Sequence, residues 1–261
     1  MLNFLCQSEA ISQLKLLKEY NRQSILIEGC TGCGKTYLAG QFASMVGVSD
    51  FQIVEPKVDA IRKSIETCIQ LNEPIVLCIE NLDCGVPAAS YSLLKFLEEP
   101  YPKVYIVVTC RNIRNIPDTI ISRSAVVTIA PPTDWDLAVF GSNVDSSKLS
   151  TLSKTAIWKC ARTFSDVSTI FNMNQEQLSY FATLSNLNNS KDSVSSIVWK
   201  LGHYEDNSET PVEIAIRYIM NDINLPFVNK CGIECIRDLN SGRVAQHAIL
   251  AKFVFNLKYC E

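Results

Sequence analysis

Residues 29–36 read GCTGCGKT, and they follow an apolar run and precede a segment with helical periodicity. The apolar run, Ile-Leu-Ile at 25–27, predicts a strand, and we expect a helix to begin near Lys35. Glycines at a strand-to-helix turn let successive backbone N–H groups face one concavity, where they and the helix N-terminus hold phosphate oxygens. We therefore interpret this segment as a phosphate-binding loop and its ligand as a nucleotide.

The fixed positions of the loop match this interpretation. Lys35 places a positive charge on the β- and γ-phosphates, and the Thr36 hydroxyl is positioned to ligate Mg²⁺. We expect the whole loop to surround the phosphates, that is Gly29, Cys30, Thr31, Gly32, Cys33, Gly34, Lys35 and Thr36. The competing interpretation, a glycine-rich turn that binds nothing, does not explain why both flanking elements match as well.

The composition indicates a globular protein. The chain has 261 residues, 47% of them hydrophobic, which is enough for one large domain or two to three small ones. The formal net charge of −3, from 24 basic and 27 acidic residues, argues against an autonomous DNA-binding protein. The chain start lacks a signal-peptide pattern and no run approaches about 20 apolar residues, so we expect a cytoplasmic protein without a membrane partner.

The chain contains 11 cysteines without paired spacing, which predicts reduced thiols and no structural disulfides. Cys30 and Cys33 form a C-x-x-C, but they occupy variable positions of the phosphate loop, and we interpret the spacing as coincidence. Cys231 and Cys235 are spaced for one helix face, yet no second pair of ligands lies nearby. We therefore expect no zinc site.

Strands and helices alternate through the first half of the chain. Strand-like apolar runs occur at 25–27, 51–55, 75–79 and 104–109, and helical periodicity at 8–20, after Lys35, at 58–69 and at 90–99. This alternation around a phosphate loop predicts a doubly wound α/β nucleotide domain that ends near Ala130. Pro131-Pro132 is the expected linker, because neither residue donates a backbone hydrogen bond. The remainder reads as helical, with predicted helices at 152–162, 175–184 and 244–257.

Four segments beyond the loop resemble the clamp-loader branch of the AAA+ ATPases. SLLKFLEEP at 92–100 is similar to the family's ALLKTLEEP, and PDTIISRS at 117–124 resembles its SRC motif. The helical region after the linker resembles the family's lid, and 235–257 resembles its last collar helices. The related proteins are the bacterial DNA polymerase III tau/gamma and delta-prime subunits and the small subunits of replication factor C. A short collar and the lack of a cysteine-rich zinc insert resemble a compact or phage-type member.

The resemblance implies a P-loop AAA+ αβα sandwich over 1–130, a small helical lid over 131–185 and a helical collar for oligomerisation over 186–261. It implies an ATP-binding subunit of a DNA sliding-clamp loader, which uses ATP with Mg²⁺ to open the clamp and load it on primer-template DNA during replication. The implied partners are sister subunits in a hetero- or homo-oligomer, expected to be pentameric, the sliding clamp and the primer-template.

The resemblance also assigns residues. Arg123 corresponds to an arginine finger offered to the nucleotide of a neighbouring subunit, where its cation offsets charge on the γ-phosphate. Glu80 corresponds to the carboxylate that holds Mg²⁺ with Thr36, and Arg111 aligns with the first sensor of the γ-phosphate. Lys95 is a candidate contact to DNA phosphates, although a surface lysine balanced by neighbouring glutamates explains it equally well.

Asn81 departs from the family pattern, which has a glutamate there to polarise the attacking water. An amide cannot accept a proton, so we expect binding to survive and hydrolysis to be weak. Asp83 lies close enough in sequence to substitute, with its direction left open. The second sensor arginine is replaced in 162–168, where Ser165 aligns and Arg162 is the nearby unassigned candidate.

Two alternatives to a hydrolysing loader subunit stay open. The first is a structural subunit of the same assembly, which binds ATP tightly, hydrolyses it weakly and donates Arg123 to a catalytic neighbour. The second is a different P-loop protein, either an AAA+ helicase loader or a small kinase. Helicase loaders usually lack the SLLKFLEEP-like helix, and kinases need arginines over an acceptor site, so the region after Pro131 fits neither well.

Overall fold

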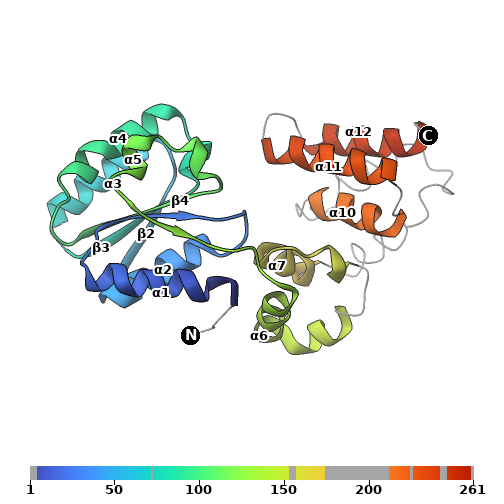
Figure 1. The fold of residues 1–261 in the computed structure, drawn as a ribbon, viewed down its shortest axis with the longest axis horizontal. Coiled ribbons are helices and arrows are strands. Elements are labelled where there is room, and N and C mark those ends of the chain that lie inside the picture. The colour runs from blue at the N-terminus through green and yellow to red at the C-terminus, as the bar shows by residue number, and fades with distance from the viewer. Residues whose placement is uncertain are drawn as a thin grey trace. The chain divides into compact units, whose positions relative to one another are not determined.

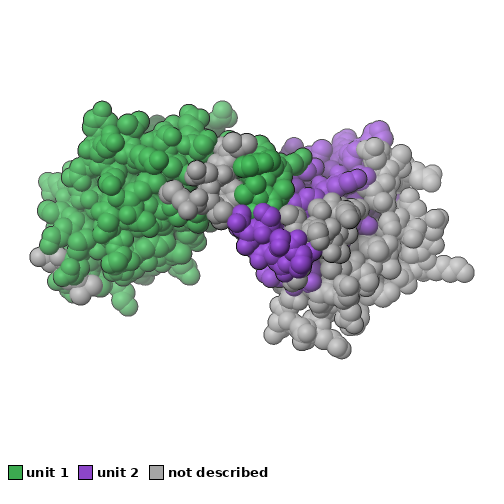
Figure 2. Space-filling view, turned by 90° about the horizontal axis from the view of Figure 1, so that it is seen from below, with its two compact units in different colours: residues 1–139, 163–165 green, residues 140–162, 166–261 purple. Residues whose placement is uncertain are grey.

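The computed structural model describes residues 5–71, 73–152, 157–173, 212–223, 226–241 and 246–259. It divides into two compact units (Figure 2), one of residues 1–139 and 163–165, the other of residues 140–162 and 166–261. The predicted lid–collar boundary at 185/186 and the predicted helix at 175–184 lie outside the described residues.

The first unit is built on one sheet of five strands in the order β2-β3-β4-β1-β5 (Figure 1). All of its strand pairs are parallel. The strands are β1 (Ser24–Glu28), β2 (Asp50–Val54), β3 (Ile75–Ile79), β4 (Val104–Cys110) and β5 (Ala125–Thr128). The first four confirm the predicted strands, and β5 is an edge strand that the apolar pattern did not reveal.

Helices cover both faces of this sheet (Figure 1). On one face lie α1 (Leu5–Glu19) and α2 (Lys35–Val46), and on the other α3 (Val58–Leu71), α4 (Pro87–Glu98) and the short α5 (Asp118–Ile121). Single-turn 3₁₀ helices η1 (Leu82–Cys84) and η2 (Ile113–Asn115) follow β3 and β4. The result is the α/β sandwich that the alternating pattern predicts.

Strand β3 shows why the sequence folds this way. All five of its residues are buried, because both faces of the sheet are covered. Ile75, Leu77 and Ile79 belong to the core under α3, α4 and α5, whereas Val76 and Cys78 belong to the core under α1 and α2. Successive side chains alternate between the two faces, so one apolar run supplies two cores.

The second unit is helical in the described residues. It contains most of α6 (Asp134–Leu152) and α7 (Phe164–Asn172), the 3₁₀ turn η3 (Trp158–Cys160), and α10 (Val212–Ile223), α11 (Pro226–Ser241) and α12 (Gln246–Tyr259). Helices α10, α11 and α12 pack on one another, and α12 confirms the helix predicted near the end of the chain. The prediction of a single helix over 152–162 was wrong, since residues 158–160 form a 3₁₀ turn.

Helix α6 changes direction at Asp145, whose backbone leaves helical geometry with φ −160° and ψ 101°. The Asp145 carboxylate accepts hydrogen bonds from the backbone N–H and the hydroxyl of Ser147. This is the geometry of an N-cap, so a second helical segment starts there. Within the described ranges, no helix combines the length and apolar character needed to cross a membrane.

Candidate nucleotide-binding site

The loop between β1 and α2 curves around its own lysine. Gly32 and Gly34 adopt left-handed backbone angles, with φ of +75° and +93°, which glycine reaches without steric cost. Lys35, the first residue of α2, is only 7% exposed. Its Nζ donates to the carbonyl oxygens of Gly29 and Cys30, each at 2.9 Å. The ammonium group is therefore held within the curve of the loop, where phosphate oxygens could reach it.

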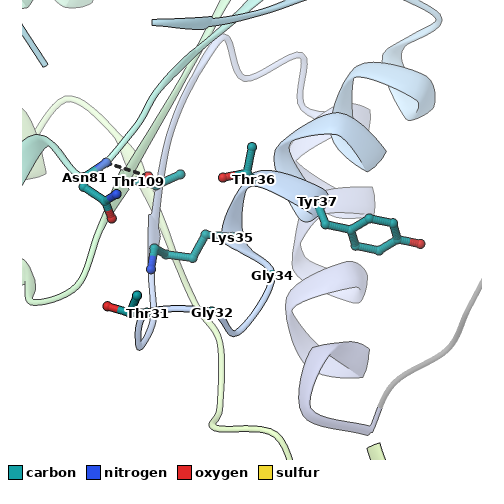
Figure 3. Close-up of a pocket in the computed structure, with 8 residues that line it drawn as sticks. All are labelled: Thr31, Gly32, Gly34, Lys35, Thr36, Tyr37, Asn81 and Thr109. Carbon is teal, nitrogen blue, oxygen red and sulfur yellow. Dashed lines mark hydrogen bonds between the residues drawn. The ribbon is translucent and has the colours of Figure 1, made fainter. Parts of the chain in front are cut away.

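A pocket of about 220 Å³ opens beside this lysine (Figure 3). It is lined by Thr31, Gly32, Gly34, Lys35, Thr36, Tyr37, Asn81 and Thr109. The lining comes from the loop, from the start of α2, and from the carboxyl ends of β3 and β4. Ligands of open parallel sheets bind at this end of the strands, so the location fits a nucleotide.

The structure places the predicted magnesium ligands together. The Thr36 hydroxyl donates a hydrogen bond to Oε1 of Glu80, which follows β3 directly. Hydroxyl and carboxylate oxygens are hard donors of the kind that Mg²⁺ prefers. This pair of donors fits the ion, and Thr36 and Glu80 are the residues that would hold it.

Asn81 and Thr109 meet at the carboxyl ends of neighbouring strands. Asn81 has a left-handed backbone, with φ of +48°, which asparagine tolerates better than most residues. Its backbone N–H donates to the Thr109 hydroxyl at 2.9 Å (Figure 3). Both residues line the pocket, so the carboxamide of Asn81 lies where the resemblance places a catalytic carboxylate.

Asp83 is committed to the backbone. Its Oδ2 accepts from the N–H groups of Arg111 and Asn112, at 3.1 and 3.3 Å. The carboxylate thus ties η1 to the segment after β4, and Asp83 is not among the residues that line the pocket. The Asp83 carboxylate therefore points toward the segment after β4. In this structure it does not take the place of the catalytic glutamate that the family has at the position of Asn81.

Arg111 is exposed and does not line the pocket. Thr109, two residues earlier, does, and its hydroxyl already contacts the Asn81 backbone. Sequence reasoning missed Thr109 although a polar residue at the end of an otherwise apolar run was a usable signal. It also missed Tyr37, whose ring points away from Lys35 and Thr36 (Figure 3).

The two loop cysteines lie outside the pocket lining. Cys33 is fully buried and Cys30 is exposed. A hydrogen bond to the Cys30 thiol, together with burial, raises the pKa of the Cys33 thiol well above its usual range. Cys33 therefore stays protonated and packs as a small apolar residue.

A segment that follows the linker and α6 touches the phosphate loop within the first unit. The Phe164 N–H donates to the Gly32 carbonyl at 3.0 Å. A Cβ on Gly32 would lie 2.6 Å from the Thr163 hydroxyl and 2.8 Å from the Ser165 Cβ. Ser165, the residue aligned with the second sensor, is thus brought to the loop. The Arg162 guanidinium contacts the Ala161 carbonyl at 3.5 Å and Arg162 does not line the pocket.

Arg123 lies away from the lining residues. Its guanidinium pairs with Glu98 Oε1 of α4 at 3.0 Å and donates to the Thr119 carbonyl at 3.0 Å. The side chains of Arg123 and Glu98 are 36% and 53% exposed. Arg123 is therefore solvent-accessible and does not contribute to the pocket of its own chain.

Comparison with known proteins agrees with this geometry. Residues 48–133 match the family model described as DNA polymerase III, delta subunit. A DNA polymerase III gamma subunit-related protein of Thermotoga maritima superposes with a TM-score of 0.52 and 14% identity, over 94% of this chain and 97% of that one. The A156S mutant of Thermotoga maritima RuvB superposes with a TM-score of 0.51 and 14% identity, over 97% of this chain and 83% of that one. No curated protein matches the chain.

The structural likeness at this identity establishes the fold, which is the αβα sandwich of the AAA+ ATPases with a helical second unit. The family match covers strands β2, β3, β4 and β5, but not β1 or the phosphate loop. It includes Glu80, Asn81 and Arg123. The chain thus has the fold of these proteins, and its residues 48–133 resemble a DNA polymerase III subunit.

Proposed function

We propose that this chain is an ATP-binding subunit of a DNA sliding-clamp loader. In this role it uses ATP binding and hydrolysis to open the clamp and to load it on primer-template DNA during replication. The observation that carries the proposal is the pocket lined by Lys35 and Thr36, together with the hydrogen bond from the Thr36 hydroxyl to Glu80. The match of residues 48–133 to a DNA polymerase III subunit supports the choice of a loader over other P-loop proteins.

Each binding residue has a physical task in this proposal. Lys35 is buried in the loop and exchanges its carbonyl contacts for the β- and γ-phosphate oxygens. Thr36 and Glu80 would hold Mg²⁺, which neutralises charge on the same phosphates when bound. Thr109 and Asn81 line the same pocket, and we assign to them the contacts to the attacking water.

The proposal gives the chain partners as well. Arg123 acts in trans on the nucleotide of an adjoining subunit, which requires a ring of sister subunits, homo- or hetero-oligomeric and expected to be pentameric. Residues 1–130 then form the nucleotide domain, 131–185 the lid and 186–261 the collar. The sliding clamp and the primer-template are the further partners, and cytoplasm is the compartment.

One observation favours a second candidate function, a structural subunit of the same assembly. Asn81 supplies an amide where hydrolysis needs a proton acceptor, and the Asp83 carboxylate is bonded to backbone elsewhere. Such a subunit binds ATP tightly, hydrolyses it slowly and lends Arg123 to a neighbour that hydrolyses faster.

Phosphate release tests the main proposal. The purified chain is incubated with Mg-ATP alone, with its cognate ring clamp, and with clamp plus primed DNA, and a Lys35→Ala variant serves as the matched control. The proposal predicts release that rises when clamp and primed DNA are both present, and no release from the control. Tight binding without stimulation would favour the structural subunit, and failure to associate with the clamp would overturn both.

A further inference from the structure

Gln7 of α1 is a buried polar residue that the proposed chemistry leaves unused. Its side chain is 0% exposed, whereas glutamine is mostly found at protein surfaces. Its Nε2 donates to the carbonyl oxygen of Cys33 at 2.9 Å. Its Oε1 has no hydrogen-bond partner among the described residues. Because a buried unpaired acceptor is unfavourable, the contact to the loop has to offset that cost.

The Gln7 carboxamide also fits against the next residue of the loop. A Cβ on Gly34 would lie 2.5 Å from Nε2 of Gln7, a distance that no real Cβ could keep. Gly34 is moreover in a left-handed conformation, with φ of +93°. Glycine at this position therefore leaves the space that the glutamine head occupies. The contact is specific to the residues that immediately precede Lys35.

Planar peptide geometry turns this contact into a constraint on the phosphate site. The peptide between Cys33 and Gly34 is trans, as are all peptide bonds of the described residues. In a trans peptide the C=O and the N–H point in opposite directions. Since the Cys33 carbonyl is directed at Gln7, the Gly34 N–H is directed away from α1. Gly34 is also one of the residues that line the pocket.

A second contact acts in the same way on the preceding peptide. The Gly32 carbonyl accepts from the Phe164 N–H at 3.0 Å, and this donor also comes from outside the loop. Two carbonyls, those of Gly32 and Cys33, are thus held by groups outside the loop. A carbonyl that turned inward instead would present a partial negative charge to a phosphate oxygen and repel it.

We propose that Gln7 is a positioning residue for phosphate capture, which holds the Cys33 carbonyl out of the phosphate site so that the Gly34 N–H can donate to a nucleoside di- or triphosphate. The assignment rests on the proposed function of this pocket. It deepens that function, because it places part of the affinity in α1, outside the loop. The group served is the β-phosphate, so ATP and ADP should depend on Gln7 equally.

The first test compares two substitutions of glutamine on the same helix. Gln7→Met keeps the length and the packing but removes the donor. Gln13→Met is the matched control, because Gln13 also has a buried Oε1 without a partner and lies about 9 Å further along α1. We expect Gln7→Met to weaken binding of both Mg-ADP and a non-hydrolysable Mg-ATP analogue about tenfold, and Gln13→Met to leave both unchanged.

The second test uses a variant whose donor depends on pH. In Gln7→Glu a protonated carboxyl donates to the Cys33 carbonyl, whereas an ionised one cannot and repels phosphate. The affinity of this variant relative to wild type should fall as the pH rises between about 5.5 and 8.5. The groups around this place are Cys6, Cys30, Cys33, Lys35 and Asp136. They are the same in both proteins, so a difference between the two pH profiles arises from the group at position 7.

Isothermal titration calorimetry provides the affinities, and thermal unfolding without nucleotide shows whether each variant folds. The proposal would be supported if Gln7→Met lost the same affinity for ADP and for the ATP analogue, and if only Gln7→Glu lost affinity relative to wild type as the pH rises. Wild-type affinity in folded Gln7→Met, or one pH profile shared by wild type and Gln7→Glu, would overturn it. If wild type itself binds neither nucleotide, the proposed function of the pocket fails rather than the role of Gln7.

Discussion

Asn81 is the residue from which we predict slow hydrolysis beside intact binding. Lys35 and Thr36 line the pocket, and the Thr36 hydroxyl is hydrogen-bonded to Glu80. The carboxamide of Asn81 lines the same pocket but cannot take a proton from water. At the level of single residues, the chain is therefore expected to bind ATP well and to hydrolyse it slowly.

The substitution Asn81→Glu should raise the hydrolysis rate. A positioned general base contributes about 10²- to 10⁴-fold to such reactions, so we expect an increase of at least roughly tenfold. Steady-state phosphate release in the presence of clamp and primed DNA measures it. Asn81→Gln keeps an amide of the glutamate's size and should stay at the wild-type rate. Equal rates for the two variants would show that Asn81 is not the limiting defect.

Arg123 is held by a contact that is easily broken. Its partner Glu98 is half exposed, and exposed ion pairs contribute about 0–1 kcal/mol. A γ-phosphate from another subunit can therefore compete with Glu98 for the guanidinium. The proposed role in trans therefore requires only that this weak intrachain pair with Glu98 be exchanged.

Arg123→Ala and Lys35→Ala should have different effects. Arg123→Ala should leave the chain's own affinity for a non-hydrolysable ATP analogue unchanged, because the residue does not line the pocket. In the assembled loader it should lower hydrolysis about 10³-fold or more, as expected for a lost arginine finger. Lys35→Ala should abolish both. If Arg123→Ala weakened binding in the isolated chain as much as Lys35→Ala does, action in trans would be wrong.

At the scale of elements, hydrophobic periodicity predicted the strands and helices correctly where the apolar runs are long and buried on both faces of the sheet. Strands β3 and β4 are buried along nearly their whole length, so their hydropathy was unambiguous. Strand β5 has only four residues, and two of them are exposed, so it left no comparable signal. In the helical region, the cap at Asp145 and the 3₁₀ turn at 158–160 depend on local hydrogen bonds that apolar spacing does not encode.

The candidate site was predictable to the extent that local sequence determines it. The loop residues follow from a strand-loop-helix pattern, and the family resemblance pointed to Glu80, which the structure shows hydrogen-bonded to Thr36. The choice between Thr109 and Arg111 depends on where β4 ends relative to the pocket, and Gln7 reaches the loop from a separate helix. These are tertiary contacts, and one sequence does not reveal them.

Buried thiols in the sheet should make the stability of the fold sensitive to alkali. Burial, aided by nearby carboxylates, raises the pKa of Cys78 in β3 and of Cys110 in β4 to about 12 each. An unfolded thiol has a pKa of about 8.5, so its stabilising contribution is complete below that pH. The free energy of unfolding should then fall as the pH rises toward 12, by at most about 1.4 kcal/mol per pH unit for each thiol.

Urea unfolding at about pH 8 and pH 10 measures this loss. A double variant, Cys78→Ala with Cys110→Ala, should lose less stability between the two conditions than wild type, although it starts lower because of the cavities. Cys84→Ala, at an exposed cysteine of η1, is the control and should behave as wild type. The same pH dependence in all three proteins would contradict the assignment to the buried thiols.

At the scale of the whole molecule, the net charge limits how the proposed loader subunit could bind DNA. A net charge of −3 gives the isolated chain little attraction for DNA phosphates. Lys95 is exposed on α4, where it could contribute to a basic surface formed by several subunits. Binding of a primer-template is therefore expected from a ring rather than from one chain.

The mass of the protein in solution checks this expectation. With a non-hydrolysable ATP analogue and Mg²⁺, light scattering should show an oligomer, and a pentamer would identify a self-sufficient loader. A monomer under these conditions would mean that sister chains of different sequence complete the ring. Loss of the oligomer on removal of nucleotide would link assembly to the occupied pocket.

Equilibrium titration of the chain with a non-hydrolysable ATP analogue and Mg²⁺ tests the central claim most directly. The account predicts saturable binding at one site per chain, loss of binding in Lys35→Ala, and weaker binding without Mg²⁺ because Thr36 and Glu80 then lack their ion. No measurable affinity of the folded wild-type chain, or equal affinity of Lys35→Ala, would contradict the account.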